Sequence, residues 1–356
     1  MKRRSLPTDG RGTQENPPNR FERIHFEPGE ADPSDGDTPS PTLLYRDSSK
    51  TVLAENDSPD LGFRFSVNPY RGCEHGCVYC YARPTHEYLS FSAGLDFETR
   101  IMVKQDVPEL LRHAFLSAKW VPQTVALSGN TDCYQPVERH LRLTRRCLEV
   151  FLELRNPVSV ITKSHLVTRD VDLLSTLARE RAAHVFVSIT TLDADLARRL
   201  EPRAATPSRR IEAVEALHAA GVPVGVMLAP IIPGLNDSEI PAILERAAAA
   251  GAGSAGWTLM RLPKPVDQLF VDWLERHFPQ RRERILGRIR QCRSGQLTDT
   301  TFGRRMRGQG VYAEQIAALF STAARRTGLD KQLAPLSTAS FRRPPRPGEQ
   351  LSLYGM

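Results

Sequence analysis

Three of the six cysteines, Cys73, Cys77 and Cys80, lie in one short stretch that reads NPYRGCEHGCVYCYA. Six cysteines are too few for a disulfide scaffold in a chain of 356 residues, and clustered thiols in a reducing compartment are typical of metal binding or catalysis. A tetrahedral zinc site would take its fourth ligand from His75 or His86. Alternatively, three thiolates bind three irons of a [4Fe–4S] cluster and leave the fourth iron open to a substrate or cofactor.

The elements that must position these cysteines follow a regular pattern. Short apolar runs typical of buried strands alternate with amphipathic helices, and the strands are expected at RFSV, QTVALSG, VSVITK, HVFVSIT, VPVGVMLAP and SAGWTLM. About six repeats predict an α/β fold with a parallel sheet, either open and doubly wound or a full or partial barrel. Both folds place functional groups at the carboxyl ends of the strands. Polar motifs follow the first five strands there: the cysteine stretch, GNTDCYQP, TKSH, SITTLD and PIIPGLND.

Composition divides the chain into four parts. Residues 1–48 are rich in Pro, Gly, Asp, Ser and Arg and are expected to be disordered or loosely packed. The predicted catalytic core spans 49–262, an Arg-rich helical extension spans 263–330, and a flexible tail spans 331–356. No window approaches the roughly 18 apolar residues that a membrane span needs, so we expect a cytoplasmic protein without membrane contact.

The cysteine spacing, the aromatic Tyr79 before the third cysteine and the strand context resemble the radical S-adenosylmethionine (SAM) superfamily. The resemblance implies a partial (β/α)6 barrel of the TIM type with a helical C-terminal extension. It also implies a [4Fe–4S] cluster on Cys73, Cys77 and Cys80, with SAM on the open iron and a reducing electron donor such as flavodoxin or ferredoxin. Reductive cleavage of SAM would give a 5′-deoxyadenosyl radical that removes a hydrogen atom from the substrate.

The same resemblance implies SAM-binding residues at the strand ends. The superfamily binds the SAM amino group after the second strand, usually through Gly-Gly-Glu, where this chain has a Ser-Gly-Asn-Thr-Asp run at 128–132. The side chains of Asn130, Thr131 and Asp132 are the three alternatives for this contact. The implied residues are Gly129, Asn130, Thr131, Asp132, Lys163, Ser188, Arg199 and Ile231, with Arg203 as an alternative to Arg199. Two of these have plainer interpretations: Lys163 as a surface lysine, and PIIPGLND as a turn before a capped helix.

Within the superfamily, NPYRGCEHGCVYCYARP, NTDCYQPVE and EPRAATPSRR are similar to the spore photoproduct lyase-related branch, over most of residues 50–310. Its namesake repairs a thymine dimer by reversible hydrogen abstraction, with a cysteine as hydrogen donor and tyrosines beside the cluster. Tyr79 and Tyr81 match the tyrosine positions, and Cys133 lies near the donor position, after a Thr-Asp pair instead of before it. A half-buried spectator thiol is the alternative for Cys133.

Two further segments bear on the partner. Between Arg276 and Arg307 ten arginines stand against two acidic residues, a net charge of +8 compared with +7 for the whole chain. Such a segment suits phosphate contacts, and a solvated helical face is the alternative.

The terminal Gln350–Tyr354, QLSLY, resembles the peptides by which bacterial repair proteins dock onto the DNA sliding clamp. The alternative is that this peptide packs on its own domain.

The function expected from these features is a radical SAM enzyme that acts on nucleic acid in the manner of a DNA repair photoproduct lyase. Three alternatives stay open: a radical SAM enzyme that modifies a protein or small metabolite, a zinc-stabilised non-catalytic DNA-binding module, and a clamp-tethered scaffold.

Overall fold

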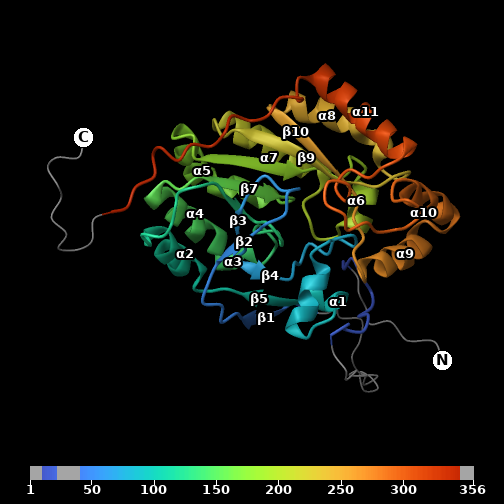
Figure 1. Ribbon diagram of the computed structural model, residues 1–356, viewed down its shortest axis with the longest axis horizontal. Helices are drawn as coiled ribbons and strands as arrows, with labels where there is room; N and C mark the ends of the chain where they lie inside the picture. Colours follow the sequence, from blue (N-terminus) through green and yellow to red (C-terminus); the bar gives the residue numbers. More distant parts are fainter. Residues whose placement is uncertain (1–9, 22–40, 345–356) are drawn as a thin grey trace.

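The computed structural model describes residues 10–21 and 41–344. Its centre is a seven-stranded sheet in the order β10-β9-β8-β7-β6-β3-β2, in which the first six strands are parallel and β2 pairs antiparallel with β3 (Figure 1). The strands are β2 (Leu53–Glu55), β3 (Phe65–Val67), β6 (Val125–Leu127), β7 (Val158–Thr162), β8 (Ala183–Ser188), β9 (Val224–Ile231) and β10 (Ser254–Leu259). The predicted strands are confirmed as six parallel strands in chain order, with β2 and β10 as the two edges of the described sheet.

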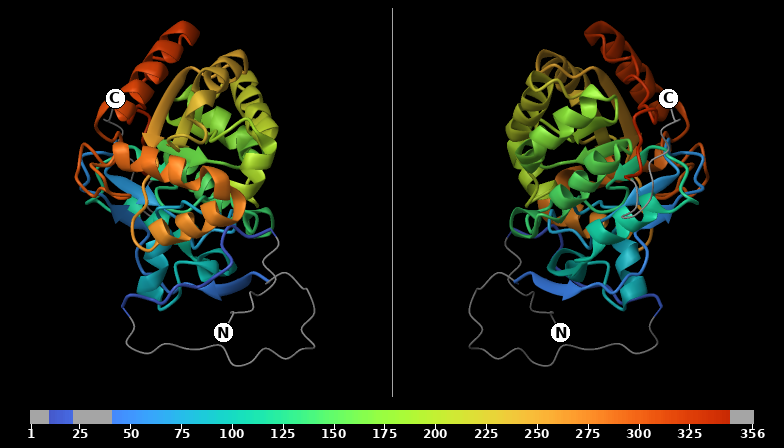
Figure 2. Two further views of the ribbon diagram at one scale, coloured as in Figure 1. Left: turned by 90° about the vertical axis from the view of Figure 1, so that its right-hand side faces the viewer. Right: turned by 90° about the vertical axis from the view of Figure 1, so that its left-hand side faces the viewer.

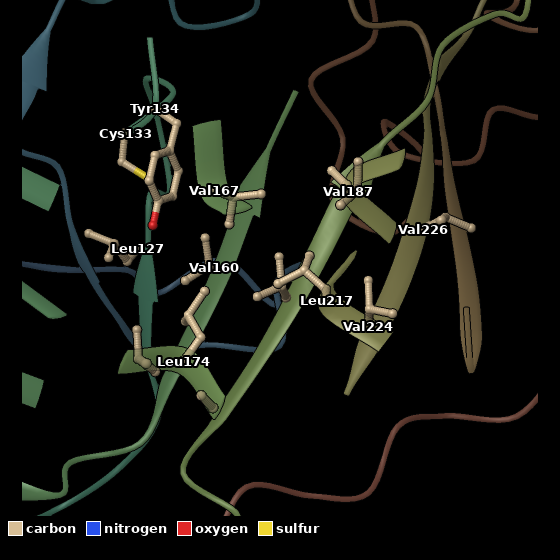
Figure 3. Packing of buried hydrophobic residues seen from close by; sticks show 14 of the residues in the cluster. Leu127, Cys133, Tyr134, Val160, Val167, Leu174, Val187, Leu217, Val224 and Val226 are labelled. Carbon is tan, nitrogen blue, oxygen red and sulfur yellow. The ribbon is translucent and has the colours of Figure 1, made fainter. Parts of the chain in front are cut away.

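Helical crossovers join the parallel strands and cover the sheet. They are α2 (Val107–Leu116), α3 (Glu138–Leu141), α4 (Leu143–Leu154), η2 (His165–Asp170), α5 (Val171–Arg179), α6 (Ala194–Leu200), α7 (Pro207–Ala219), η3 (Asp237–Glu239) and α8 (Ile240–Ala249). In α4 the buried residues recur every three or four positions, which gives the helix one apolar face for the sheet. Strand residues such as Val160, Val187 and Val226 are fully buried beneath these helices (Figure 3). The structure thus has the partial (β/α)6 barrel architecture expected from the sequence.

A second, smaller sheet combines an insertion between β3 and β6, which supplies β4 and β5, with β1 from the N-terminal part of the chain. Its order is β1-β5-β4, and its strands are β1 (Leu43–Arg46), β4 (Tyr70–Arg71) and β5 (Arg100–Val103). The 3-10 helix η1 (Arg83–Leu89) and the helix α1 (Leu95–Thr99) connect β4 to β5. This insertion carries the cysteine stretch, so it forms one wall of the site.

The N-terminal segment departs from the expectation of loose packing over residues 1–48. The backbone N–H groups of Gly12 and Thr13 donate to the Glu98 carboxylate at 2.9 and 3.0 Å, and residues 43–46 form β1 in parallel register with β5. The prediction is therefore wrong for residues 10–21 and 43–46, because their backbone groups find partners on the insertion. Residues 1–9 and 22–40 lie outside the described residues.

The C-terminal extension is helical, as predicted, with α9 (Val266–His277), η4 (Pro279–Arg281), α10 (Arg282–Gln291) and α11 (Val311–Thr327). Figure 2 shows α11 at one end of the molecule and the small sheet at the other. The residues after α11 follow the body, since Ser337 N donates to Arg181 O at 2.8 Å and Arg342 N to Leu154 O at 2.9 Å. The predicted flexible tail is thus wrong for residues 331–344.

Two other expectations bear on the ends of the chain and the membrane. The peptide Gln350–Tyr354 lies outside the described residues. None of the described helices is long and apolar enough to cross a membrane.

Candidate active site

The cysteine stretch follows β3 and β4 at the carboxyl end of the parallel sheet. Cys73 and Cys77 are buried at 6% and 8% exposure, Cys80 is half-buried, and none of the three forms a disulfide. The turn between the first two requires glycine, because Gly76 has a φ of +69°. The N-terminal segment covers this turn so closely that a Cβ atom on Gly12 would lie 1.5 Å from Gly76 O.

The three thiols share one buried environment. Burial raises the pKa of the Cys73 thiol, and the charges of Asp132 and the other two cysteines raise it further. Burial also raises the pKa of Cys77 and of Cys80. Metal ligation requires the thiolate form, so these thiols need positively charged iron beside them to become ligands.

The two histidines near the cysteine stretch bear on the choice between a [4Fe–4S] cluster and a Cys3His zinc site. In a [4Fe–4S] cluster each thiolate binds a different iron, so the thiols need not surround one point. His75 lies instead 3.4 Å from Asp132, and His86 packs between the rings of Phe91 and Phe97. The donor set therefore fits the cluster better than the Cys3His zinc site.

A buried ion pair fixes the backbone of the cysteine stretch. Arg83 Nη2 lies 2.6 Å from Glu98 Oε1, and both side chains are fully buried. Arg83 Nε also donates to Cys77 O at 2.9 Å. Since Glu98 accepts the N-terminal N–H groups as well, one carboxylate ties the N-terminal segment to the cysteines.

Glu74 links the cysteine stretch to the loops after β6 and α6. Its backbone N–H donates to Gln135 Oε1 at 2.9 Å, and its carboxylate accepts from Val137 N at 2.6 Å. Arg203 Nη2 lies 3.1 Å from the same carboxylate. Arg203 therefore positions the cysteine stretch in this structure.

In the run at 128–132, the three alternative side chains for the SAM amino group differ in whether they already have a hydrogen-bond partner. Thr131 Oγ1 donates to Tyr70 O at 2.7 Å. The Asp132 carboxylate accepts from Thr162 Oγ1 and from Lys163 N, both at 2.7 Å. Asn130 is half-buried, its backbone N–H donates to Asn68 Oδ1 at 2.9 Å, and no partner for its side chain is found within the described part of the chain. Asn130 is thus the member of the three that is available to a ligand.

Gly129 lies at the tightest point of this loop. A Cβ atom there would lie 2.9 Å from Ser66 Cβ, so any larger residue would push β3 and β6 apart. Its carbonyl accepts a hydrogen bond from Tyr81 OH at 3.0 Å. The glycine therefore allows the backbone to approach both its neighbouring strand and the tyrosine beside Cys80.

Lys163 faces the strand ends and is not a surface lysine. It is half-buried, its Nζ donates to Ala229 O at 3.1 Å, and its ammonium lies 6.0 Å from the centre of the Tyr79 ring. This arrangement brings together the ends of β7 and β9 and the residue before the third cysteine. The ammonium can meet an anionic group at this position.

A buried polar network lies beneath Lys163. Tyr79 OH donates to Glu201, which also accepts from Thr190 Oγ1 at 2.6 Å and pairs with Arg210. Burial disfavours the charged carboxylate, but Arg210 and Lys163 outweigh it and lower the pKa of Glu201 to about 2. Glu201 and Arg210 were not predicted as site residues, although both lie in the quoted motif EPRAATPSRR.

Three further predicted residues lie in different environments. Ser188 is 4% exposed at the end of β8, where its carbonyl accepts from Arg210 Nη1 at 3.1 Å. Ile231 is 2% exposed and its side chain belongs to the main core. Arg199 is exposed on α6, with its guanidinium 5.5 Å from the centre of the Phe278 ring. Ser188 thus lies at the strand ends, whereas Ile231 contributes packing and Arg199 contacts the C-terminal extension.

The predicted catalytic residues differ sharply in access. Tyr81 is 48% exposed, and Arg261, which follows β10, lies 5.5 Å from the centre of its ring. Tyr79 is buried. Cys133 is fully buried beside Tyr134 (Figure 3), and burial raises its pKa. The structure therefore presents Tyr81 to solvent and encloses the thiol that was expected to be a donor or a half-buried spectator.

The ten arginines of the segment 276–307 divide into engaged and available side chains. Arg293 is buried and donates to Met260 O at 2.7 Å, and Arg305 pairs with Asp60 at 2.5 Å. Arg282 and Arg304 pair with acids of the extension. The arginines exposed on α9, on α10 or between them are Arg276, Arg281 and Arg284, of which Arg281 also donates to Gly234 O at 2.9 Å. The apolar faces of these helices pack in a buried cluster that also contains Cys77 and Tyr79, and the exposed arginines lie on their outer surface.

Comparisons with known proteins agree with this geometry. The sequence profile of the Radical SAM superfamily matches residues 67–247. The uncharacterized protein Rv2578c of Mycobacterium tuberculosis is 39% identical over 222 residues, which cover 62% of this chain and 65% of that protein, slightly less than two thirds of its length. The Radical SAM Nalpha-GlyT isomerase of Pseudomonas phage M6 is 24% identical over 58% of this chain and 42% of its own. Spore photoproduct lyase complexed with dinucleoside spore photoproduct superposes with a TM-score of 0.52 at 16% identity, covering 80% of this chain and 78% of its own.

Proposed function

Because this chain belongs to the radical SAM superfamily, with a [4Fe–4S] cluster and SAM as its cofactors, we propose that it is an enzyme that abstracts a hydrogen atom from a nucleic-acid substrate. One observation carries the proposal: α9 and α10 pack in one buried cluster with Cys77 and Tyr79 of the cysteine stretch, and the same helices expose arginines on their outer surface. When bound, the cluster and SAM supply the radical that abstracts the hydrogen atom.

In this proposal Cys73, Cys77 and Cys80 hold the cluster. Asn130 and Lys163 bind the polar groups of SAM, because the side chain of Asn130 is available at the end of β6 and the ammonium of Lys163 lies over Tyr79. Glu201 keeps Tyr79 in place and balances the charge of Arg210. A one-electron donor such as flavodoxin or ferredoxin remains part of the proposal.

Tyr81 is the residue that meets the substrate. Its ring is half-exposed and its hydroxyl is held by Gly129 O at 3.0 Å, so the phenol has one orientation at the edge of the site. Cys133 is enclosed in the core, and a donor role would require the β6 loop to open. We therefore assign hydrogen relay to Tyr81 in preference to Cys133.

The choice of nucleic acid has two supports. Exposed arginines suit phosphate contacts, and a protein of similar fold is complexed with a dinucleoside spore photoproduct. A repair reaction of the photoproduct lyase kind is the finer form of this proposal. Modification of a protein or small metabolite is the competing function.

The test is SAM cleavage by anaerobic protein with a reconstituted cluster. Formation of 5′-deoxyadenosine is measured alone, with intact DNA, with ultraviolet-irradiated DNA and with a mixture of peptides. We expect nucleic acid to increase the rate and peptides to leave it unchanged. Stimulation by peptides alone would favour the competing function, and a colourless protein that retains stoichiometric zinc and takes up no iron would exclude both.

A further inference from the structure

Two exposed aromatic rings near the site each carry a guanidinium group on one face. Tyr81 is 48% exposed, and Arg261 lies 5.5 Å from its ring centre. Phe302 is 53% exposed, and Arg305 lies 4.3 Å from its ring centre. A stacked guanidinium restrains each ring and leaves part of its surface to solvent.

The two pairs are held together by the end of β10. Arg261 follows this strand, and its Nη1 lies 3.8 Å from Met306 Sδ. Leu259 N donates to Met306 O at 2.8 Å, which fixes the loop 299–307 along the strand end. Burial lowers the pKa of Arg261 and the charge of Arg305 lowers it further, whereas Tyr81 and Asp60 act in the opposite direction.

This loop also spans the open side of the barrel. Gly303 N donates to Asp60 Oδ1 at 2.6 Å, and Arg305 Nε donates to Asp60 Oδ2 at 2.5 Å. Asp60 lies between β2 and β3, and the loop 299–307 is attached to β10, so the contact joins the two edges of the described sheet. Phe302 is therefore held at the junction of two anchored loops.

The two arginines at this junction, Arg261 and Arg305, differ in how their charges are compensated. Arg305 is neutralised by Asp60. Arg261 is half-buried and contacts a ring and a thioether, and no salt bridge to it is found in the residues that the structure describes. The nearby charge of Asp60 raises its pKa, but that carboxylate is paired with Arg305. A partly desolvated cation without a salt bridge of its own favours an anionic ligand, and half-exposed aromatic rings favour a flat one. A nucleotide with its base unpaired offers both groups.

We propose that Tyr81, Arg261 and Phe302 form a platform that binds unpaired nucleotides, with bases stacked on the two rings and a phosphate on Arg261. The inference rests on the proposed function and narrows its substrate to single-stranded or flipped-out nucleotides. Paired bases in a duplex bury their faces against one another and cannot stack on side chains. The exposed arginines of α9 and α10 then contact the flanking backbone.

The test compares Phe302→Ala with Phe302→Trp in the full chain with its reconstituted cluster. The probe is a fluorescent oligothymidylate of about 12 nucleotides, alone or annealed to its complement, and binding is followed by anisotropy. Loss of one stacked base is expected to weaken single-strand binding about 5- to 150-fold. Phe302→Trp should retain the affinity, and Tyr88→Ala, which removes a ring on η1 that is 75% exposed compared with 53% for Phe302, is the control.

Salt dependence separates stacking from charge. Phe302→Ala should leave the slope of log affinity against log salt unchanged, whereas Arg261→Gln should reduce it by about one. Two results would overturn the platform and leave the proposed function intact. One is equal affinity of the wild-type protein and Phe302→Ala for the single strand, and the other is a preference of the wild-type protein for the duplex. Failure of the wild-type protein to bind either probe would overturn both.

Discussion

Replacing Glu201 with Gln tests the buried network that holds Tyr79 beside the cysteines. Gln has nearly the same shape and its Oε1 can still accept from Tyr79 and Thr190, but its Nε2 replaces the oxygen that accepts from Arg210, so the variant loses one charge and that hydrogen bond. Arg210, which is 2% exposed, would then be buried without its counter-ion. Removing one partner of a buried ion pair typically costs about 3–5 kcal/mol.

The pKa of Glu201 gives an independent estimate of the same quantity. It falls from an ordinary value of 4.5 to about 2 in the folded protein. At ~1.4 kcal/mol for each pKa unit, this is about 3 kcal/mol of folding free energy at pH 7. Because the folded-state pKa is the lower one, this stability is present above the unfolded pKa and is lost as pH falls toward the folded pKa. About 1 kcal/mol of it should be lost between pH 7 and ~pH 4.

The assay is urea unfolding of metal-free protein, wild-type and Glu201→Gln, at both pH values. Metal-free protein is used because a bound cluster would add its own stabilisation. We expect a gap of about 3 kcal/mol at pH 7 that narrows by about 1 kcal/mol at ~pH 4. Asp195→Asn, in an exposed pair with Arg198, is the control and should cost less than ~1 kcal/mol. A gap below ~1 kcal/mol, or one that does not change with pH, would refute this account of the network.

Three other predictions concern the cluster, the arginines and the C-terminal peptide. Ala at Cys73, Cys77 or Cys80 should abolish iron binding and the brown colour, whereas Cys147→Ala, inside α4, should retain both in an iron assay. Reversing the charge of Arg276, Arg281 and Arg284 should reduce the salt slope of DNA binding by about three and leave substrate-free SAM cleavage unchanged; an unaltered slope would assign these arginines to a solvated face. A peptide of residues 347–356 should bind bacterial sliding clamp with micromolar-scale affinity that Leu353→Ala with Tyr354→Ala abolishes; a peptide that gives no calorimetric binding signal would remove this support for a repair setting.

The parallel strands were predictable because each is a short, continuous apolar run bounded by polar loops. Val158–Thr162 and Ala183–Ser188 show this pattern, and their burial on both faces of the sheet explains it. The small sheet was not predictable in the same way. Tyr70–Arg71 is too short for a periodic pattern, and β1 is mostly exposed, so tertiary pairing with β5 determines both strands.

The site was predictable where one local motif supplies it. The cysteines and the loop at 128–132 stand out in the sequence, but local sequence does not reveal which side chain of that loop is available. Asp132 accepts hydrogen bonds from Thr162 at the end of β7 and from the following Lys163, which are 30 and 31 positions away in the chain. Arg305 finds its partner Asp60 at a separation of 245 residues. Contacts of this range follow from the fold and not from composition, which is why a count of arginines overestimates the charge available to a substrate.

Buried arginines are paired differently on the two sides of the site. Beside the cysteines, Arg83 and Arg210 are each buried against a carboxylate, so these cations add little net charge near the cluster ligands. At the open side, Arg261 is desolvated without such a partner among the described residues. The nucleic-acid substrate proposed above would therefore be drawn to the edge of the barrel that carries Tyr81. The charge of Arg261 belongs to the chain itself, so under this proposal the edge would select an anionic substrate independently of the cofactor.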